Sequence, residues 1–309
     1  MDTTPETSAA EYRTWADAPE TRRAVARQWT AWEKWATQQS VPPLPAPPRS
    51  VAEYLAHLAS GKRWAASSTA QALWAINRTH TAHGYAAPGH DPEVHAVLAG
   101  IRRKTPRAPK QQRPLTIEDF SRLPRTMLPP QTALAARNLA LLLLGFAACL
   151  RRSELAALDV ADISSVGTSL AVRIRTSKTD PTGTGAIVMV PASLRYPSCC
   201  PVRLLYAWLS LRTMTPGPLF LAFTGKHLVA PARRISPTVV DKLVKQAAST
   251  LGLDSRLYGS HSLRAGGATY LSRMGVTVQA IARHGRWRSL DMVLHYCRDD
   301  AYSAIAAVL

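Results

Sequence analysis

Apolar side chains recur at helical spacing near the start of the chain. In residues 21–40, four large ones recur every three or four positions and would share one side of a helix: Val25, Trp29, Trp32 and Trp35. The proline-rich run 42–48 ends this pattern, because proline cannot continue a helix. We interpret the tryptophans as core packing rather than as exposed stacking surfaces.

Three more helical patterns follow before the first clear break. The second helix is predicted to begin with Ser50 as its N-cap and to run to Gly61. A third covers residues 67–83, and a fourth lies between Asp91 and Pro106. Residues 1–105 are therefore predicted to form a small all-helical domain.

The remainder of the chain mixes helical and alternating patterns. Thr116 and Asp119 bracket the first turn of a predicted helix, and a long apolar helix follows over 131–150. Alternation at 170–176 and 186–191, on either side of a Gly/Pro/Asp-rich turn, predicts a β-hairpin. Further helices are predicted over 201–213, 236–252, 262–274, 277–284 and 289–306. Residues 115–309 are thus expected to form an α+β domain, mainly α with a small β-sheet.

The charge of the chain points to a partner. Lys and Arg number 38 against 20 Asp and Glu, so the formal net charge is +18, and 24 of the basic but only 11 of the acidic residues lie in 111–309. Nucleic acid is the common partner of such a surface, because each neutralised phosphate releases a condensed counterion. A basic surface that only keeps the protein soluble is the alternative. The apolar fraction of 46% fits a folded globular protein.

A basic segment joins the two predicted domains. The string IRRKTPRAPKQQRP at 101–114 has no apolar periodicity, and we interpret 106–114 as an interdomain linker. Blocks of this kind are usually solvated, but one that lies beside two domains could straddle a DNA backbone. The candidate phosphate contacts are Arg102, Arg103, Lys104, Arg107 and Lys110.

Other features favour a cytoplasmic protein with no membrane partner. The cysteines form no C-x-x-C pair, so we expect reduced thiols and no metal site at Cys149, Cys199, Cys200 and Cys297. The N-terminus is polar and acidic, unlike a secretory signal. The longest apolar run, 139–150, is shorter than the roughly 20 residues that a membrane span requires.

Three short strings carry candidate chemistry. CLRRSEL at 149–155 places two arginines at the end of the apolar helix, where they could simply reach to the surface. HSLR at 261–264 puts His261 and Arg264 on one face at the start of a helix, which favours an anion. GRWRSLDMVLHY at 285–296 ends on Tyr296, in a short helix that Ser289 can cap. Each string alone is a weak signal.

Taken in order, the strings resemble the active-site signature of the tyrosine recombinases and phage integrases, carried here by Arg151, Lys178, His261, Arg264, Trp287 and Tyr296. The nine-residue step from Trp287 to Tyr296 matches the family's spacing between its second His/Trp position and its nucleophile. Tryptophan in place of the commoner histidine is typical of Cre-like members. The likeness covers most of 113–309. In 1–110 it is only architectural, a helical core-binding domain followed by a linker.

The same residues suit attack on a phosphodiester. Arg151 and Arg264 could clamp the non-bridging oxygens, on which negative charge develops during attack. Tyr296 needs help to lose its proton, because the ordinary pKa of a tyrosine is about 10. His261 is a suitable proton acceptor or phosphate donor.

Three further roles complete the predicted site. The resemblance implies a hairpin lysine that protonates the leaving 5′ oxygen, and Lys178 is the lysine of the predicted hairpin. Trp287 would offer its indole N–H to the phosphate while its ring packs the pocket. Glu154 could orient Arg151 or His261, or it could be a surface carboxylate. No metal or cofactor is expected, because the phosphotyrosyl bond stores the energy of the broken phosphodiester.

The predicted function is site-specific strand exchange through a 3′-phosphotyrosyl intermediate and a Holliday junction, in integration, excision or resolution. The apolar residues 304–309 resemble the C-terminal helix that family members donate to a neighbouring protomer. The resemblance implies a homotetramer on double-stranded DNA. It also implies association with the nucleoid, in a bacterial, phage or plasmid context. A tail folded onto its own domain is the alternative. Two other functions stay open: a DNA-relaxing enzyme like the type IB topoisomerases, and a catalytically silent DNA-binding regulator.

Overall fold

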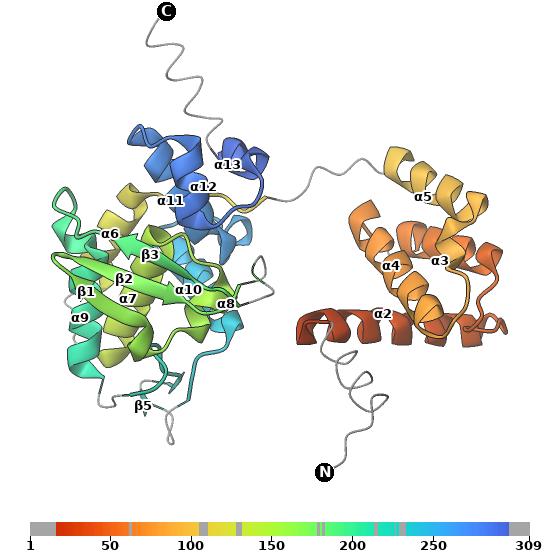
Figure 1. Cartoon of the computed structure of the whole chain (residues 1–309), viewed down its shortest axis with the longest axis horizontal. Helices are drawn as coiled ribbons and strands as arrows, with labels where there is room; N and C mark the ends of the chain where they lie inside the picture. The colour runs from red at the N-terminus through yellow and green to blue at the C-terminus, as the bar shows by residue number, and fades with distance from the viewer. Residues whose placement is uncertain are drawn as a thin grey trace, which may run out of the picture. The chain divides into compact units, whose positions relative to one another are not determined.

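The computed structural model describes residues 17–61, 64–104, 111–127, 132–177, 180, 183–212, 216–225, 227–228 and 233–296. The chain divides into two units, residues 1–110 and 111–309, and each has its own hydrophobic core (Figure 1). The predicted class is confirmed, since the described residues are mainly helical with a small β-sheet.

The first unit is all-helical where it is described, with helices α2 (Pro19–Gln38), α3 (Pro48–Ser60), α4 (Ala66–Ala82) and α5 (Pro92–Lys104) and the short 3-10 helix η1 (Pro88–His90). Trp32 is fully buried, and Trp29 and Trp35 pack against the same core, so the interpretation of these tryptophans is confirmed. The prediction that Ser50 caps α3 is wrong. The helix already begins at Pro48, because the fixed φ of proline suits a first helical turn, and Ser50 is buried within it.

The second unit contains a three-stranded antiparallel sheet of order β1-β2-β3, from β1 (Ile163–Val166), β2 (Ser169–Ile174) and β3 (Ala186–Val190). Strands β2 and β3 form the predicted hairpin, in which Val172 lies opposite Val188. Strand β1 was not predicted, because its sequence ISSV has too few apolar residues to show alternation. The two-residue strands β4 (Phe223–Thr224) and β5 (His227–Leu228) were not predicted either.

Helix α7 (Ala133–Ala147) is central and largely buried in this unit, and it is contacted by α8 (Arg152–Ala157), α9 (Pro201–Leu211), α10 (Pro237–Thr250) and α11 (His261–Arg273). Helices α12 (Val278–Gly285) and α13 (Leu290–Tyr296) pack with α11 around a small core of their own. The unit also contains α6 (Ile117–Met127) and the 3-10 turns η2 (Val160–Asp162), η3 (Pro197–Cys199) and η4 (Ser255–Leu257). Thr116 and Asp119 cap α6 as predicted, since each backbone N–H donates to the other side chain.

The end of α7 determines where helix α11, which carries His261 and Arg264, can lie. Helix α7 stops at Ala147 rather than at 150, and Cys149 takes a left-handed φ of 48° that turns the chain back. Helix α11 passes so close that a Cβ at Gly267 would lie 2.3 Å from the Phe146 carbonyl oxygen. The starts of α8 and α11 are thereby brought together. In the described part of the chain, no helix has both the length and the apolar character needed to cross a membrane.

Candidate active site

Arg151 is held by the carboxylate of Glu154. The residue precedes α8, and its backbone N–H and its Nη1 donate to the two oxygens of Glu154, at 2.8 and 2.7 Å. The Glu154 side chain is 1% exposed, whereas that of Arg151 is 19% exposed. Of the two predicted targets of Glu154, the structure therefore pairs it with Arg151, and the surface-carboxylate alternative is wrong.

The β2–β3 turn shares this carboxylate. Ser177 Oγ donates to Glu154 Oε1 at 2.7 Å and accepts from Arg151 Nη1 at 2.7 Å. The turn is closed by Asp180, whose carboxylate accepts the backbone N–H of Gly185 at 2.7 Å. Ser177 directly precedes the predicted proton donor Lys178, which lies outside the described residues.

Helix α11 carries His261 on its first residue and Arg264 one turn later. Arg264 is 1% exposed, and its Nη1 donates to the Cys149 carbonyl oxygen. Its Nη2 is buried and has no hydrogen-bond partner among the described residues. A buried N–H group without a hydrogen-bond partner costs stability. Such a group is available to donate a hydrogen bond to a bound anion.

The segment after α12 and helix α13 place Trp287 and Tyr296 near Arg264. The guanidinium carbon of Arg264 lies 3.8 Å from the centroid of the Trp287 ring. The rings of Trp287 and Tyr296 are 5.8 Å apart, and Tyr296 ends α13. The indole folds directly over Gly285, where a Cβ would lie 1.6 Å from a ring carbon. The structure thus brings five of the six predicted catalytic residues into one cluster: Arg151, His261, Arg264, Trp287 and Tyr296.

The electrostatics of the cluster keep the phenol neutral and the guanidinium charged. Burial raises the pKa of Tyr296, and the charge of Arg264 opposes that rise. Burial lowers the pKa of Arg264 to about 10, so this group keeps its charge at neutral pH. Partial desolvation lowers the pKa of His261, and three guanidinium groups lower it further: those of Arg264, Arg151 and Arg152. A neutral imidazole can accept a proton from the neutral phenol.

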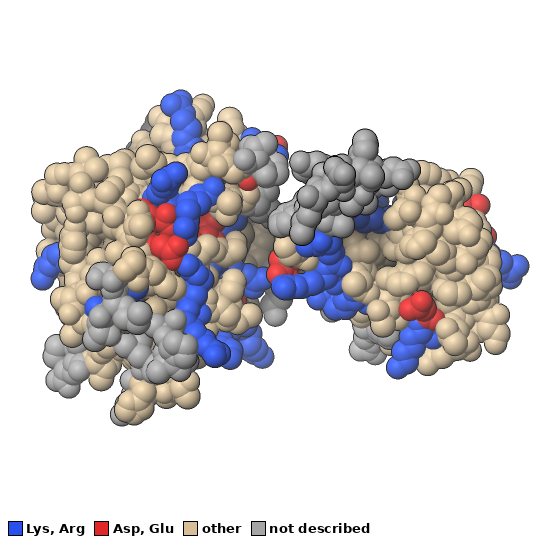
Figure 2. Space-filling model, turned by 60° about the horizontal axis from the view of Figure 1, so that its bottom comes forward, with Lys and Arg blue, Asp and Glu red and all other residues tan. Residues whose placement is uncertain are grey.

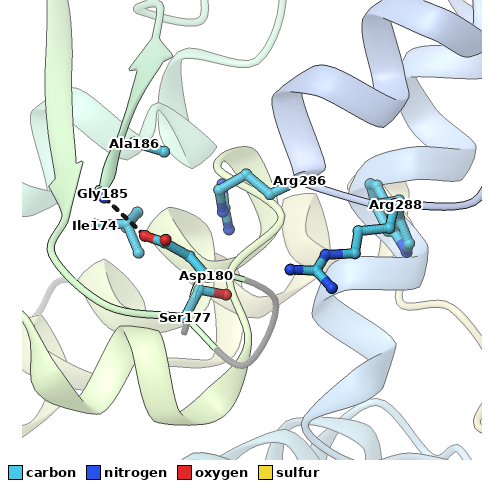
Figure 3. A pocket seen from close by; sticks show the side chains of 8 residues that line it. Ile174, Ser177, Asp180, Gly185, Ala186, Arg286 and Arg288 are labelled. Atoms are coloured by element: carbon cyan, nitrogen blue, oxygen red, sulfur yellow. Dashed lines mark hydrogen bonds between the residues drawn. The ribbon is translucent and has the colours of Figure 1, made fainter. Parts of the chain in front are cut away.

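A hollow of about 240 Å³ lies between the β2–β3 turn and the segment after α12. Figure 3 shows the side chains of Arg286 and Arg288 on one side of it and those of Ser177 and Asp180 on the other. On the face that Figure 2 displays, Lys and Arg side chains gather around a few acidic ones on the 111–309 unit. The surface beside the cluster therefore offers positive charge and space to a polyanion.

Sequence reasoning missed three contributors to this cluster. They are Ser177, Arg286 and Gln112. Ser177 and Arg286 both bind the carboxylate of Glu154. The side-chain oxygen of Gln112 accepts the backbone N–H of His261 at 2.8 Å. The string GRWRS offered one hint, since a basic residue stood directly before the predicted tryptophan. The partners of all three lie at least 23 residues away, beyond the reach of a local pattern.

The remaining predicted residues have mixed outcomes. Arg102, Arg103 and Lys104 form the exposed end of α5, whereas Arg107, Lys110, Cys297 and residues 304–309 lie outside the described residues. His284, a rival of Trp287 by position, is within hydrogen-bond distance of the Ala147 carbonyl oxygen, 2.8 Å from Nε2, and burial lowers its pKa. It has a packing role there.

Comparison with known proteins agrees with this geometry. The model of the phage integrase family matches residues 115–302. The chain is 29% identical over 282 residues to an integrase/recombinase xerD homolog of Selenomonas ruminantium, covering 90% of this chain and 81% of that protein. It is 26% identical over 292 residues to the recombinase cre of Escherichia phage P1, covering 89% and 82% respectively.

Two solved structures share the fold. The Tn1549 transposon integrase in complex with transposon right end DNA has a TM-score of 0.61 at 12% identity, covering 96% of this chain and 98% of that one. A lambda integrase dimer bound to a COC′ core site has a TM-score of 0.58 at 17% identity, covering 96% and 95%. The family model matches more than half of this chain. The chain therefore belongs to the phage integrase family and is a tyrosine site-specific recombinase, an enzyme that breaks and rejoins DNA.

Proposed function

We propose that Tyr296 is the nucleophile of this recombinase and that Arg151 and Arg264 hold the scissile phosphate. One observation carries the proposal: Arg264, which lies beside the Trp287 and Tyr296 rings, has a buried Nη2 with no hydrogen-bond partner in the described part of the chain. Two guanidinium groups that approach one phosphate stabilise the charge that builds on its non-bridging oxygens.

The proposed cleavage step makes one bond to phosphorus and breaks another. Tyr296 Oη forms a bond to phosphorus while the bond from phosphorus to the 5′ oxygen breaks, which leaves a 3′-phosphotyrosyl enzyme. His261 takes the phenolic proton, and Lys178 gives a proton to the departing 5′ oxygen. Rejoining is the reverse: a 5′ hydroxyl attacks phosphorus and the phenol leaves. Trp287 donates its indole N–H to the phosphate, and its ring packs against the guanidinium of Arg264.

The domain arrangement belongs to the same proposal. A core-binding domain (1–105) and a catalytic domain (115–309), joined by a basic linker (106–114), both bind DNA. Compact units at 1–110 and 111–309 support it, as do the exposed Arg102, Arg103 and Lys104 at the end of α5. Together with Arg107 and Lys110 they contact phosphates, and such contacts make binding fall steeply with salt.

Assembly and location are inferred from the relatives. The chain acts as a homotetramer on double-stranded DNA, with its C-terminal helix exchanged between protomers, in the cytoplasm at the nucleoid. Deletion of 304–309 should then weaken tetramers more than binding to a single site. Equal loss of both would indicate a tail that docks on its own domain.

Tyr296→Phe tests the nucleophile. The variant should bind DNA but form no SDS-resistant adduct, because the attacking oxygen is gone. Tyr206→Phe is the matched control, since this half-exposed tyrosine on α9 bonds through its hydroxyl to Ser165 and should leave the adduct unchanged. An adduct that survives in Tyr296→Phe means that another residue attacks.

Lys178→Ala tests the proton donor. Its cleavage should recover on a substrate with sulfur at the 5′ bridging position, because a thiolate leaves without an acid. If the sulfur substrate fails to restore cleavage, Lys178 is not the proton donor.

A further inference from the structure

Arg286 occupies an unusual backbone position between α12 and α13. Its φ is 58° and its ψ 44°, in the left-handed region that favours glycine. Its side chain is nevertheless only 10% exposed. A long, charged side chain is thus buried at a position where glycine would remove the backbone strain. We expect a contact of this side chain to offset the strain.

That contact is an ion pair with Glu154. Arg286 Nη2 lies 2.8 Å from Glu154 Oε2, and its Nη1 donates to the His284 carbonyl oxygen at 3.0 Å. Figure 3 shows the Arg286 side chain reaching from the end of α12 toward the β2–β3 turn. The pair connects the segment that carries Trp287 and Tyr296 to the carboxylate that holds Arg151.

Glu154 is consequently shared by two guanidinium groups. Oxygen Oε1 accepts from Arg151 Nη1 and from Ser177 Oγ, and Oε2 accepts from the Arg151 backbone and from Arg286. Without Arg286, the whole negative charge of this buried carboxylate would act on Arg151. The charge that Arg151 offers to a phosphate would be correspondingly reduced.

We propose that Arg286 is a positioning residue for DNA cleavage: by pairing with Glu154, it sets the orientation and the effective charge of Arg151 and fixes the Ser177 end of the β2–β3 turn. The inference rests on the proposed function, in which Arg151 binds the scissile phosphate. Arg286 itself need not touch DNA.

The protonation of Glu154 supports the same relation. Burial alone would raise the pKa of this carboxyl, and the charge of Arg286 is the largest influence against it; with the hydrogen bonds from Arg151 and Ser177, it brings the pKa to about 2. Among the residues that the structure describes, the cations that face the carboxylate are Arg151, Arg286 and Arg264. Loss of Arg286 should therefore raise the pKa of Glu154.

The test compares Arg286→Gly with the unmodified enzyme in single-turnover cleavage at saturating DNA. Glycine suits the left-handed φ, and Arg286→Asn is a second variant that also tolerates it. We expect adduct formation to slow about 10- to 100-fold, the usual penalty for misplaced catalytic groups, while the Kd for DNA changes little. The matched control is Arg283→Gln. Arg283 is exposed on the last turn of α12, so this change also removes one positive charge and should leave cleavage as in the unmodified enzyme.

Two readouts separate positioning from a loss of folding. In a Glu154→Gln background, Arg286→Gly should slow cleavage much less than it does alone, because no carboxylate remains to be held. As the second readout, the pKa of the Glu154 carboxyl, followed by NMR titration, should be higher in Arg286→Gly than in the unmodified enzyme. Cleavage at the normal rate in both Arg286 variants, or equal slowing in both backgrounds, overturns the inference. Absence of any adduct with the unmodified enzyme would instead refute the proposed function.

Discussion

The guanidinium carbon of Arg264 lies over the indole ring of Trp287, 3.8 Å from the ring centroid. Stacking on an aromatic face leaves the in-plane N–H groups of an arginine available for hydrogen bonds. Nη1 donates to the Cys149 carbonyl oxygen, whereas the buried Nη2 has no partner among the described residues. In the proposed mechanism, Trp287 therefore has two roles: it holds Arg264 toward the phosphate, and it donates its own indole N–H.

The two roles of Trp287 can be separated by substitution. Trp287→Phe keeps a ring over Arg264 but loses the donor, and Trp287→Ala loses both. A cation–π contact contributes about 0.5–2 kcal/mol, so we expect Trp287→Ala to form adduct about two- to thirtyfold more slowly than Trp287→Phe. Single-turnover cleavage measures the difference. Equal rates in the two variants would show that stacking contributes nothing.

Gly285→Ala should slow cleavage, because it displaces the ring of Trp287. The new Cβ would lie 1.6 Å from a carbon of the indole ring, so the ring must leave its place over Arg264. We expect cleavage to fall to the level of Trp287→Ala. In a Trp287→Ala background the same change should have little further effect, because the clash is gone. Additive losses in the double variant would place the damage elsewhere.

The pH dependence of cleavage should report His261. Its pKa lies below the ordinary value of about 6.5, through desolvation and neighbouring positive charge, so its neutral, proton-accepting form persists below that pH. The rate should fall only as the pH drops through the lowered pKa. Arg152→Gln removes one of the positive charges and should move this acid limb to higher pH. A profile of unchanged shape in Arg152→Gln would contradict the role of His261 as proton acceptor.

His80 should matter to the stability of the helical unit rather than to chemistry. Its Nε2 accepts the backbone N–H of Ala46, and its Nδ1 lies 2.8 Å from the Ile76 carbonyl oxygen, both in the core. His80→Phe leaves the buried Ala46 N–H unpaired, so we expect a loss of about 1–3 kcal/mol in the free energy of unfolding. Denaturant titration measures it. His83→Phe is the control, since His83 makes the same local contact to Thr79 while exposed, and should change stability less.

Helical periodicity and the order of the motifs by themselves determined much of this protein. Spacing of apolar residues located most of the helices within a few residues, because a helix forms from contacts three and four positions apart. Helix α8 was not predicted, since its six residues are too few to show a period. Prolines then moved individual boundaries, as at Pro48. The order of the arginine, histidine, tryptophan and tyrosine strings likewise indicated the candidate reactive groups, through its likeness to the signature of the family.

Only the tertiary structure decided which of these groups touch. Glu154 and Arg286 are 132 residues apart, and the Arg264 contact to Cys149 spans 115. Such pairs depend on how α7, α8 and α11 pack, which no local pattern contains. The left-handed turns at Cys149 and Arg286 are equally invisible in sequence, since the strain of each is balanced by long-range contacts formed only in the folded state.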